Sequence, residues 1–242
     1  MWAGVWAQEW LRGCARGGAL VRRGWRAGPC GLDAQRRNAR RLFSTTDPPC
    51  LRGALDEKGR IAAIEHHQAS GNVAAEFLPK FLMAVMGADF AAYRGAPISY
   101  AVPNRETVAW RTALPVRTGW WRGLGLLANT FAVESFMDEL AHAAGADPLQ
   151  FRLDHLSDDK DGRRTRAVLE AVGELSGWQE TPAAGRARGI AMCTDVGTIV
   201  AQVAEISLDQ ASGQIIVHNV AAAMDCGLTV NPDAPAPRSR AM

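Results

Sequence analysis

The chain has 242 residues, of which 48% are hydrophobic and 21% are charged, a composition typical of a globular protein long enough to bury a core. Its net charge of +2 is unevenly distributed, because nine arginines lie within residues 1–46 and the remainder is net acidic. This balance argues against a nucleic-acid-binding surface on the folded part, and no apolar run reaches the roughly 18 residues of a membrane-spanning helix.

Residues 1–50 differ from the rest of the chain. Four tryptophans lie among arginine, glycine and cysteine, and no helical or strand period persists. The segment ends in Arg40-Arg41-Leu42-Phe43-Ser44-Thr45-Thr46, a composition found in organellar transit peptides, but tryptophan at this density is unusual there. We therefore interpret residues 1–50 as a disordered leader outside the fold, with a transit peptide as the alternative.

The five cysteines are widely spaced and form no C-x-x-C pair or cysteine–histidine cluster. Zinc and iron–sulfur ligation by this chain are therefore not indicated, and an odd count favours reduced thiols over a disulfide framework. A reducing, cytoplasmic location is the default expectation.

Between Leu51 and Thr112 several extended segments are expected, and residues 69–97 are ambiguous. The runs 51–55 and 60–65, joined by Asp56-Glu57-Lys58-Gly59, predict a hairpin. Residues 74–86 are compatible with a helix that Gly87 follows, and residues 99–102 and 106–112 are expected to be extended on either side of Pro103.

Three helices and a second hairpin are expected in the following part. An apolar stripe at helical spacing within 129–144 ends before Gly145, and Asp147-Pro148 supplies a cap and a first-turn proline for the next helix. A third helix follows the charged loop 158–164 and ends at Gly177, and β-rich runs at 199–208 and 215–224 predict a long hairpin. The predicted fold class is α+β, with hairpins packed against a helical layer.

The segment Arg122-Gly123-Leu124-Gly125 is the leading candidate for a binding site. Two glycines around one apolar residue allow a main chain to lie close to a ligand, although an ordinary turn has the same pattern. The spacing matches neither a dinucleotide fingerprint nor a P-loop.

Other polar groups favour structural interpretations. His66 and His67 are adjacent on a predicted strand, so they point to opposite faces and cannot chelate one ion. Glu134, Asp138 and Glu139 are expected on the solvent side of a helix. Asp225-Cys226-Gly227 is expected to be a turn, and no catalytic residue and no metal ligand is assigned in the chain.

The sequence of residues 121–152, taken as a whole, is more specific for one protein family than any of its separate motifs. Trp121-Arg122-Gly123-Leu124-Gly125 followed by residues 129–152 (NTFAVESFMDELAHAAGADPLQFR) resembles the molybdopterin-binding large subunit of the xanthine dehydrogenase/aldehyde oxidase family, in the branch of isoquinoline 1-oxidoreductase beta subunits. Residues 185–190, 199–206 and 224–233 extend the match. The resemblance covers residues 51–233 as a fragment of the molybdopterin-binding domains, and 234–242 form a non-matching tail.

The resemblance implies a molybdenum–molybdopterin cofactor, with Arg122, Gly123 and Gly125 as cofactor-binding residues and Leu124 against the substrate ring. It implies hydroxylation of N-heteroaromatic compounds or aldehydes, with electrons passing to a small [2Fe-2S] iron–sulfur subunit, and allows a periplasmic location. The family's glycine–glutamine pterin motif and its Gly-x-Gly-Glu catalytic glutamate are absent from this sequence. We therefore expect an internal fragment that is inactive alone. A non-catalytic subunit-binding or assembly module, or a truncated reading frame without a stable product, is the alternative.

Overall fold

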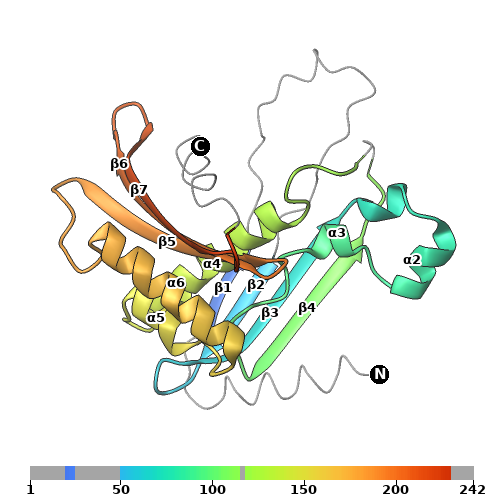
Figure 1. Ribbon diagram of the computed structural model, residues 1–242, viewed down its shortest axis with the longest axis horizontal. Coiled ribbons are helices and arrows are strands. Elements are labelled where there is room, and N and C mark those ends of the chain that lie inside the picture. The colour runs from blue at the N-terminus through green and yellow to red at the C-terminus, as the bar shows by residue number, and fades with distance from the viewer. Residues whose placement is uncertain (1–19, 25–49, 115–117, 230–242) are drawn as a thin grey trace. The chain divides into compact units, whose positions relative to one another are not determined.

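The structure is a computed structural model that describes residues 20–24, 50–114 and 118–229. These residues belong to two compact units, Met1–Ala146 and Asp147–Met242. Figure 1 labels the helices and strands of both units.

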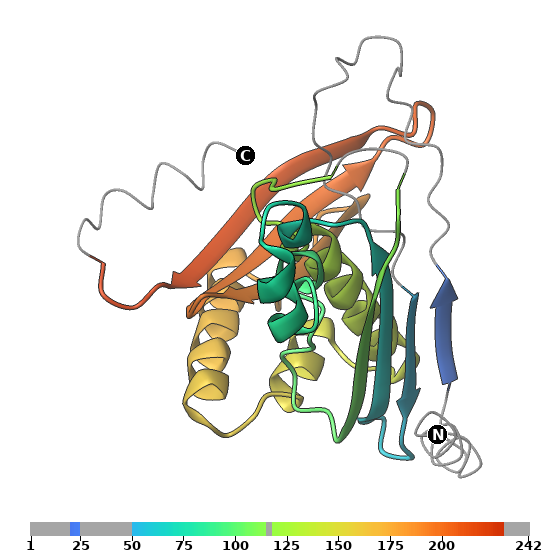
Figure 2. The same cartoon turned by 90° about the vertical axis from the view of Figure 1, so that its right-hand side faces the viewer.

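The first unit is built on a four-stranded sheet in the order β1-β2-β3-β4 (Figure 2). Its strands are β1 Leu20–Gly24, β2 Cys50–Leu55, β3 Ile61–Ser70 and β4 Asn104–Arg111. β1, β2 and β3 pair antiparallel, whereas β3 and β4 pair in parallel. A parallel pair needs a crossover connection, which here consists of the 3-10 turn η2 Ala74–Glu76 and the helices α2 Lys80–Met86 and α3 Phe90–Tyr93.

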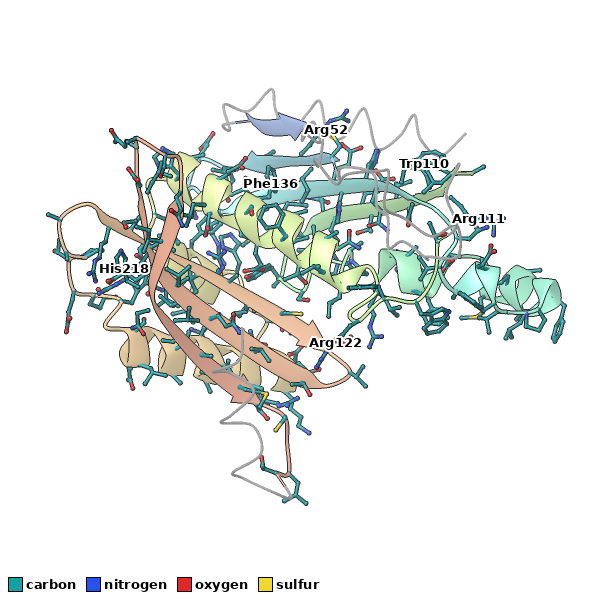
Figure 3. The ribbon with its side chains drawn as sticks, turned by 90° about the horizontal axis from the view of Figure 1, so that it is seen from above. Arg52, Trp110, Arg111, Arg122, Phe136 and His218 are labelled. Carbon is teal, nitrogen blue, oxygen red and sulfur yellow. The ribbon has the colours of Figure 1, made fainter. Side chains whose placement is uncertain are left out.

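The helix α4, Leu126–Ala143, packs its apolar stripe against this sheet. Phe136, Met137 and Leu140 are at most 2% exposed. The approach to β2 is close because Gly53 has no side chain: a Cβ at this position would lie 3.0 Å from a ring carbon of Phe136 and 3.1 Å from a methyl of Leu140. Figure 3 shows Phe136 on the side of α4 that faces the strands.

The second unit combines α5 Pro148–Asp154 and α6 Lys160–Ser176 with a three-stranded antiparallel sheet. Its strands are β5 Arg186–Asp195, β6 Thr198–Leu208 and β7 Ile215–Asp225, and α6 packs across β6 and β7. Side chains from the helices and from the inner face of the sheet form the core, including Leu149, Leu169, Val172, Ile190, Ile199 and Val203.

The α+β prediction is confirmed, and most predicted elements are present. Asp147 accepts a hydrogen bond from the backbone N–H of Gln150 with Pro148 in the first turn, and Gly177 ends α6 with φ +61°. The candidate helix 74–86 is instead η2 followed by the shorter α2, because Pro79 interrupts the segment.

Two strands were not predicted. Leu20–Gly24 lies inside the segment expected to be an unstructured leader, yet it forms β1 beside β2. Cys50, the last residue of that segment, begins β2, and residues 1–19 and 25–49 lie outside the described residues. Arg186–Asp195 forms β5, which pairs with β6 along its whole length.

Among the described residues, no helix combines the length and apolar character needed to cross a membrane.

Candidate functional site

Residues 122–125 form a turn directly before α4. The backbone N–H of Leu124 donates to the carbonyl of Trp121 at 2.9 Å, and that of Leu126 donates to the carbonyl of Gly123 at 2.9 Å. Gly123 has φ +87° and Leu124 has φ +56°, so two successive residues adopt left-handed conformations. Leucine rarely adopts such a φ, because its Cβ then crowds the neighbouring carbonyl.

Gly125 fastens this turn to α3. Its N–H donates to the carbonyl of Ala91 at 2.9 Å. A Cβ on Gly125 would lie 2.1 Å from the carbonyl oxygen of Ala92, which is far inside van der Waals contact. Asn129, one turn along α4, donates through its side-chain amide to the carbonyl of Arg94 at 3.0 Å. Glycine is therefore required at position 125 for packing, and its N–H is already engaged.

Leu124 points its side chain into a small apolar cluster. The cluster consists of Val73, Ala74, Ala91 and Ala92, with Leu78, Phe90 and Leu124 packed against it. This burial offsets the strain of the positive φ. Phe90 also meets the ring of Trp120 edge-on, with 6.1 Å between ring centroids.

Arg122 and Gly123 form the open side of the turn. Within the part of the chain that the structure describes, neither backbone N–H and no guanidinium N–H of Arg122 donates a hydrogen bond. Both residues are exposed, and a Cβ on Gly123 would have no atom within 4 Å. Figure 3 labels Arg122 in this turn. Successive free N–H groups next to a left-handed residue suit acceptor oxygens of an anionic ligand, so this pair fits a cofactor with such oxygens.

The two histidines lie on opposite faces of β3, as expected. His66 is fully buried, and its Nδ1 lies 3.0 Å from the carbonyl oxygen of Ala96. Burial lowers the pKa of His66 below its ordinary value of 6.5, and the nearby His67 lowers it further, against the opposing effect of the Ala96 hydrogen bond. A neutral imidazole that donates from Nδ1 to that carbonyl satisfies this arrangement.

His67 lies beside two carboxylates. Its Nε2 is 2.9 Å from Glu65, and ligand atoms of Glu65, His67 and Glu106 all lie within 4.8 Å of one another. Glu106 is brought there by the parallel pairing of β3 with β4, which was not predicted. The guanidinium of Arg52 is bound to Glu65 at 3.0 Å, so we interpret the group as an ion-pair cluster.

Glu134 corrects one prediction. It was expected on the solvent side of its helix, but it is 5% exposed, and it accepts a hydrogen bond from the hydroxyl of Tyr100 at 2.9 Å. Asp138 and Glu139 are half-buried. The helical period places Glu134 next to Val133 and Met137, and a phenol donor from another segment makes its burial possible.

The Asp225-Cys226-Gly227 segment is a turn, as predicted. The carboxylate of Asp225 accepts from the N–H of Gly227 at 2.9 Å and from the guanidinium of Arg164 at 2.8 Å. These two interactions, the Arg164 hydrogen bond foremost, lower the pKa of Asp225 to about 2.

The comparisons with known proteins agree on one family. Residues 50–156 match the family model of the molybdopterin cofactor-binding domain. The chain is 31% identical to the beta subunit of isoquinoline 1-oxidoreductase from Brevundimonas diminuta over 182 residues, which is 74% of this chain and 23% of that protein. It is 36% identical to the B subunit of nicotinate dehydrogenase from Pseudomonas putida over 146 residues, 53% of this chain and 12% of the relative.

A solved aldehyde oxidoreductase from Desulfovibrio gigas is also similar, with 22% identity and a TM-score of 0.42 over 71% of this chain and 20% of that structure's chain. The chain thus spans less than a quarter of the length of these relatives. The turn at 122–125 and the strands β2, β3 and β4 lie within residues 50–156, and the family resemblance inferred from the sequence is confirmed. Residues 50–156 thus match the molybdopterin cofactor-binding domain, and the chain is similar to subunits of isoquinoline 1-oxidoreductase and nicotinate dehydrogenase.

Proposed function

We propose that the turn Arg122–Gly125 supplies main-chain contacts to a molybdenum–molybdopterin cofactor, within an enzyme that hydroxylates N-heteroaromatic compounds or aldehydes. This proposal rests on the N–H groups of Arg122 and Gly123, which donate to no acceptor among the described residues, together with the open space beside Gly123. The names of the relatives, an isoquinoline oxidoreductase and a nicotinate dehydrogenase, support the substrate class.

The residues at the start and at the end of the turn have different proposed roles. Arg122 and Gly123 present N–H donors outward, where they would hold and orient acceptor oxygens of the cofactor. Gly125 and Asn129 hold the turn on α3, so the donors are fixed before the ligand arrives. Such preorganisation reduces the entropic cost of binding.

Leu124 has two candidate roles. Its side chain packs on the Val73–Ala92 cluster, and we propose that the remaining exposed part lies against the ring of a substrate. When bound, the cofactor supplies the oxidation chemistry, and its electrons would pass to a separate [2Fe-2S] subunit. The turn contains no carboxylate, so proton transfer is not assigned to it.

The test is the molybdenum content of the full chain, produced with an iron–sulfur subunit of the family in a host that makes the cofactor. We expect bound molybdenum in the wild type and at least about a tenfold loss in Gly123→Ala, because the added Cβ stands beside the donors. Gly213→Ala is the matched control: Gly213 lies in the β6–β7 turn with φ +70°, and a Cβ there would also have no atom within 4 Å.

Arg122→Ala separates main-chain from side-chain binding. It keeps the N–H, so the proposal expects molybdenum to be retained. If Gly213→Ala lost as much molybdenum as Gly123→Ala, the assignment of the Arg122–Gly125 turn to the cofactor site would be refuted. A wild-type chain that contains no molybdenum, although it binds the iron–sulfur subunit, would overturn the proposal in favour of the assembly module.

A further inference from the structure

A cavity of about 690 Å³ opens in the first unit at the carboxyl ends of the parallel strands β3 and β4. Its walls are the last residues of these strands and the segment from α2 to the start of α3. No residue of the Arg122–Gly125 turn lines it. Ligands in sheets with parallel strands commonly bind outside the carboxyl ends of those strands, and the volume is within the range of roughly 300–1,000 Å³ of small-molecule sites.

Gln68 brings an unsatisfied acceptor to this cavity. The side chain is 2% exposed, and its Nε2 donates to the carbonyl oxygen of Ala92 at 3.2 Å. Since a carbonyl can only accept, this bond fixes which end of the amide is the oxygen. The Oε1 atom is buried and has no hydrogen-bond partner within the described residues. Buried polar atoms are nearly always paired, so a donor from a ligand would complete the group.

Arg111 provides a cation on the same face of the sheet. In the register of β3 with β4, Gln68 lies opposite Ala109 and Ser70 lies opposite Arg111. Side chains alternate along a strand, so Ala109 and Arg111 share the face of Gln68 and Ser70. Arg111 lines the cavity, is exposed, and has no ion-pair partner among the residues that the structure describes (Figure 3).

Four apolar side chains also line the cavity, those of Ala75, Met83, Ala84 and Ala92. Asp89 also lines the cavity, but its carboxylate accepts from five backbone N–H groups, those of Val73, Ala74, Ala75, Ala91 and Ala92. This carboxylate is therefore occupied in holding η2 against α3. The lining of the cavity thus includes a buried amide with an unpaired acceptor, several apolar side chains and an exposed cation.

We propose that this cavity binds a small organic acid that carries an O–H or N–H donor apart from its carboxylate. The donor bonds Oε1 of Gln68, and the carboxylate pairs with Arg111. Gln68 and Arg111 are diagonal neighbours on β3 and β4, which lie about 7–8 Å apart, so one small molecule can contact both side chains. The site is separate from the proposed cofactor turn and needs no cofactor to bind its ligand.

The test is calorimetric titration of the full chain with para-hydroxybenzoate. Benzoate lacks the donor, and para-cresol lacks the anion, so each is expected to bind at least about tenfold more weakly. Inorganic phosphate distinguishes a general anion site, because it should compete poorly. Equal affinity for benzoate and para-hydroxybenzoate, or no saturable binding of para-hydroxybenzoate, would overturn the proposal.

Variants locate the site on the protein. Arg111→Gln should weaken para-hydroxybenzoate about tenfold and leave para-cresol unchanged, whereas Arg105→Gln, at the amino end of the same strand, should alter neither. Gln68→Met should remove the preference for the hydroxyl, and the ligand series on the wild type tests the same contact if that variant does not fold. Gly123→Ala should bind para-hydroxybenzoate normally, so a failure of the cofactor proposal is distinguishable from a failure of this one. Unchanged binding in Arg111→Gln would refute the assignment.

Discussion

Gly125→Ala is the sharpest test of how the turn is held in place. Gly125 has φ −67° and ψ −15°, a conformation that alanine adopts freely. On backbone grounds alone, alanine would therefore stabilise the protein by about 0.4–1 kcal/mol, because it restricts the unfolded chain.

The contacts around Gly125 predict the opposite sign. A Cβ there would lie 2.1 Å from the oxygen and 2.9 Å from the carbon of the Ala92 carbonyl, and both atoms belong to the backbone of a short helix. Overpacking of this kind costs about 1–3 kcal/mol, and moving the turn away stretches the Gly125–Ala91 hydrogen bond, which contributes about 0.5–1.5 kcal/mol. After subtraction of the backbone gain, we expect a net loss of about 0.5–4 kcal/mol.

Urea unfolding followed by circular dichroism measures this loss as a lower midpoint at unchanged slope. If the two units unfold separately, only the transition of the first should move. Gly123→Ala is the comparison, because it adds strain of about 1 kcal/mol at φ +87° without a clash. A Gly125→Ala protein as stable as the wild type, or more stable than Gly123→Ala, would refute the packing argument.

Three further predictions concern polar groups. The pKa of His66 is lowered in the folded protein, so between that pKa and 6.5 the imidazole is protonated only in the unfolded chain. The free energy of unfolding should therefore fall as pH decreases below about 6.5. In urea unfolding at several pH values, His66→Phe should show a weaker dependence on pH. Asp225 has a pKa of about 2 against an ordinary 3.8, so its carboxylate should stabilise the folded protein above pH 4, and this contribution should be lost as pH falls through about 2. In Arg164→Met, an NMR titration should show a higher pKa for Asp225. Tyr100→Phe removes the donor to buried Glu134 and should cost about 1–3 kcal/mol in urea unfolding, whereas an unchanged midpoint would contradict a structural role for this bond.

The elements that were predicted correctly from the sequence depend on short-range patterns, namely helical spacing of apolar residues and capping residues. The apolar stripe of α4 buries Phe136 and Leu140, and the Asp147-Pro148 start and the Gly177 end of the next helices lie where expected. Each of these depends on residues within one or two turns of the chain. Capping and helical periodicity are visible in such windows.

Non-local pairing accounted for the differences. The parallel pairing of β3 with β4 brings Glu106 beside Glu65 and His67, and no window of sequence contains that contact. Leu175 lies at helical spacing from Val168 and Val172 but is 66% exposed, whereas Leu169 is fully buried. Helical spacing identifies a stripe, but the neighbouring sheet decides which edge of that stripe it covers.

The sequence identified the candidate site, but it did not show that the two glycines have different roles. Gly123 and Gly125 flank the same leucine and are equivalent in the string. In the structure, Gly123 has a positive φ and open surroundings, whereas Gly125 has an ordinary φ and a carbonyl where its Cβ would be. The first is suited to a close ligand and the second to close packing, a difference that only the tertiary contacts with α3 reveal.

The carbonyl of Ala92 links the turn to the cavity. Its oxygen accepts from Nε2 of Gln68 at 3.2 Å and from the amide of Asn129 at 3.4 Å, and it is the atom that a side chain on Gly125 would strike. A Cβ on Gly125 would push this carbonyl toward Gln68 and change the position of the acceptor in the cavity. Gly125→Ala should therefore weaken para-hydroxybenzoate binding as well as stability, while Gly123→Ala should affect neither the carbonyl nor the cavity. Coupling between two sites is reciprocal. If ligand binding in the cavity returns the Ala92 carbonyl to its place, saturating ligand should recover part of the stability that Gly125→Ala loses. Identical affinities in the two glycine variants would show that the Ala92 carbonyl transmits nothing between the turn and the cavity.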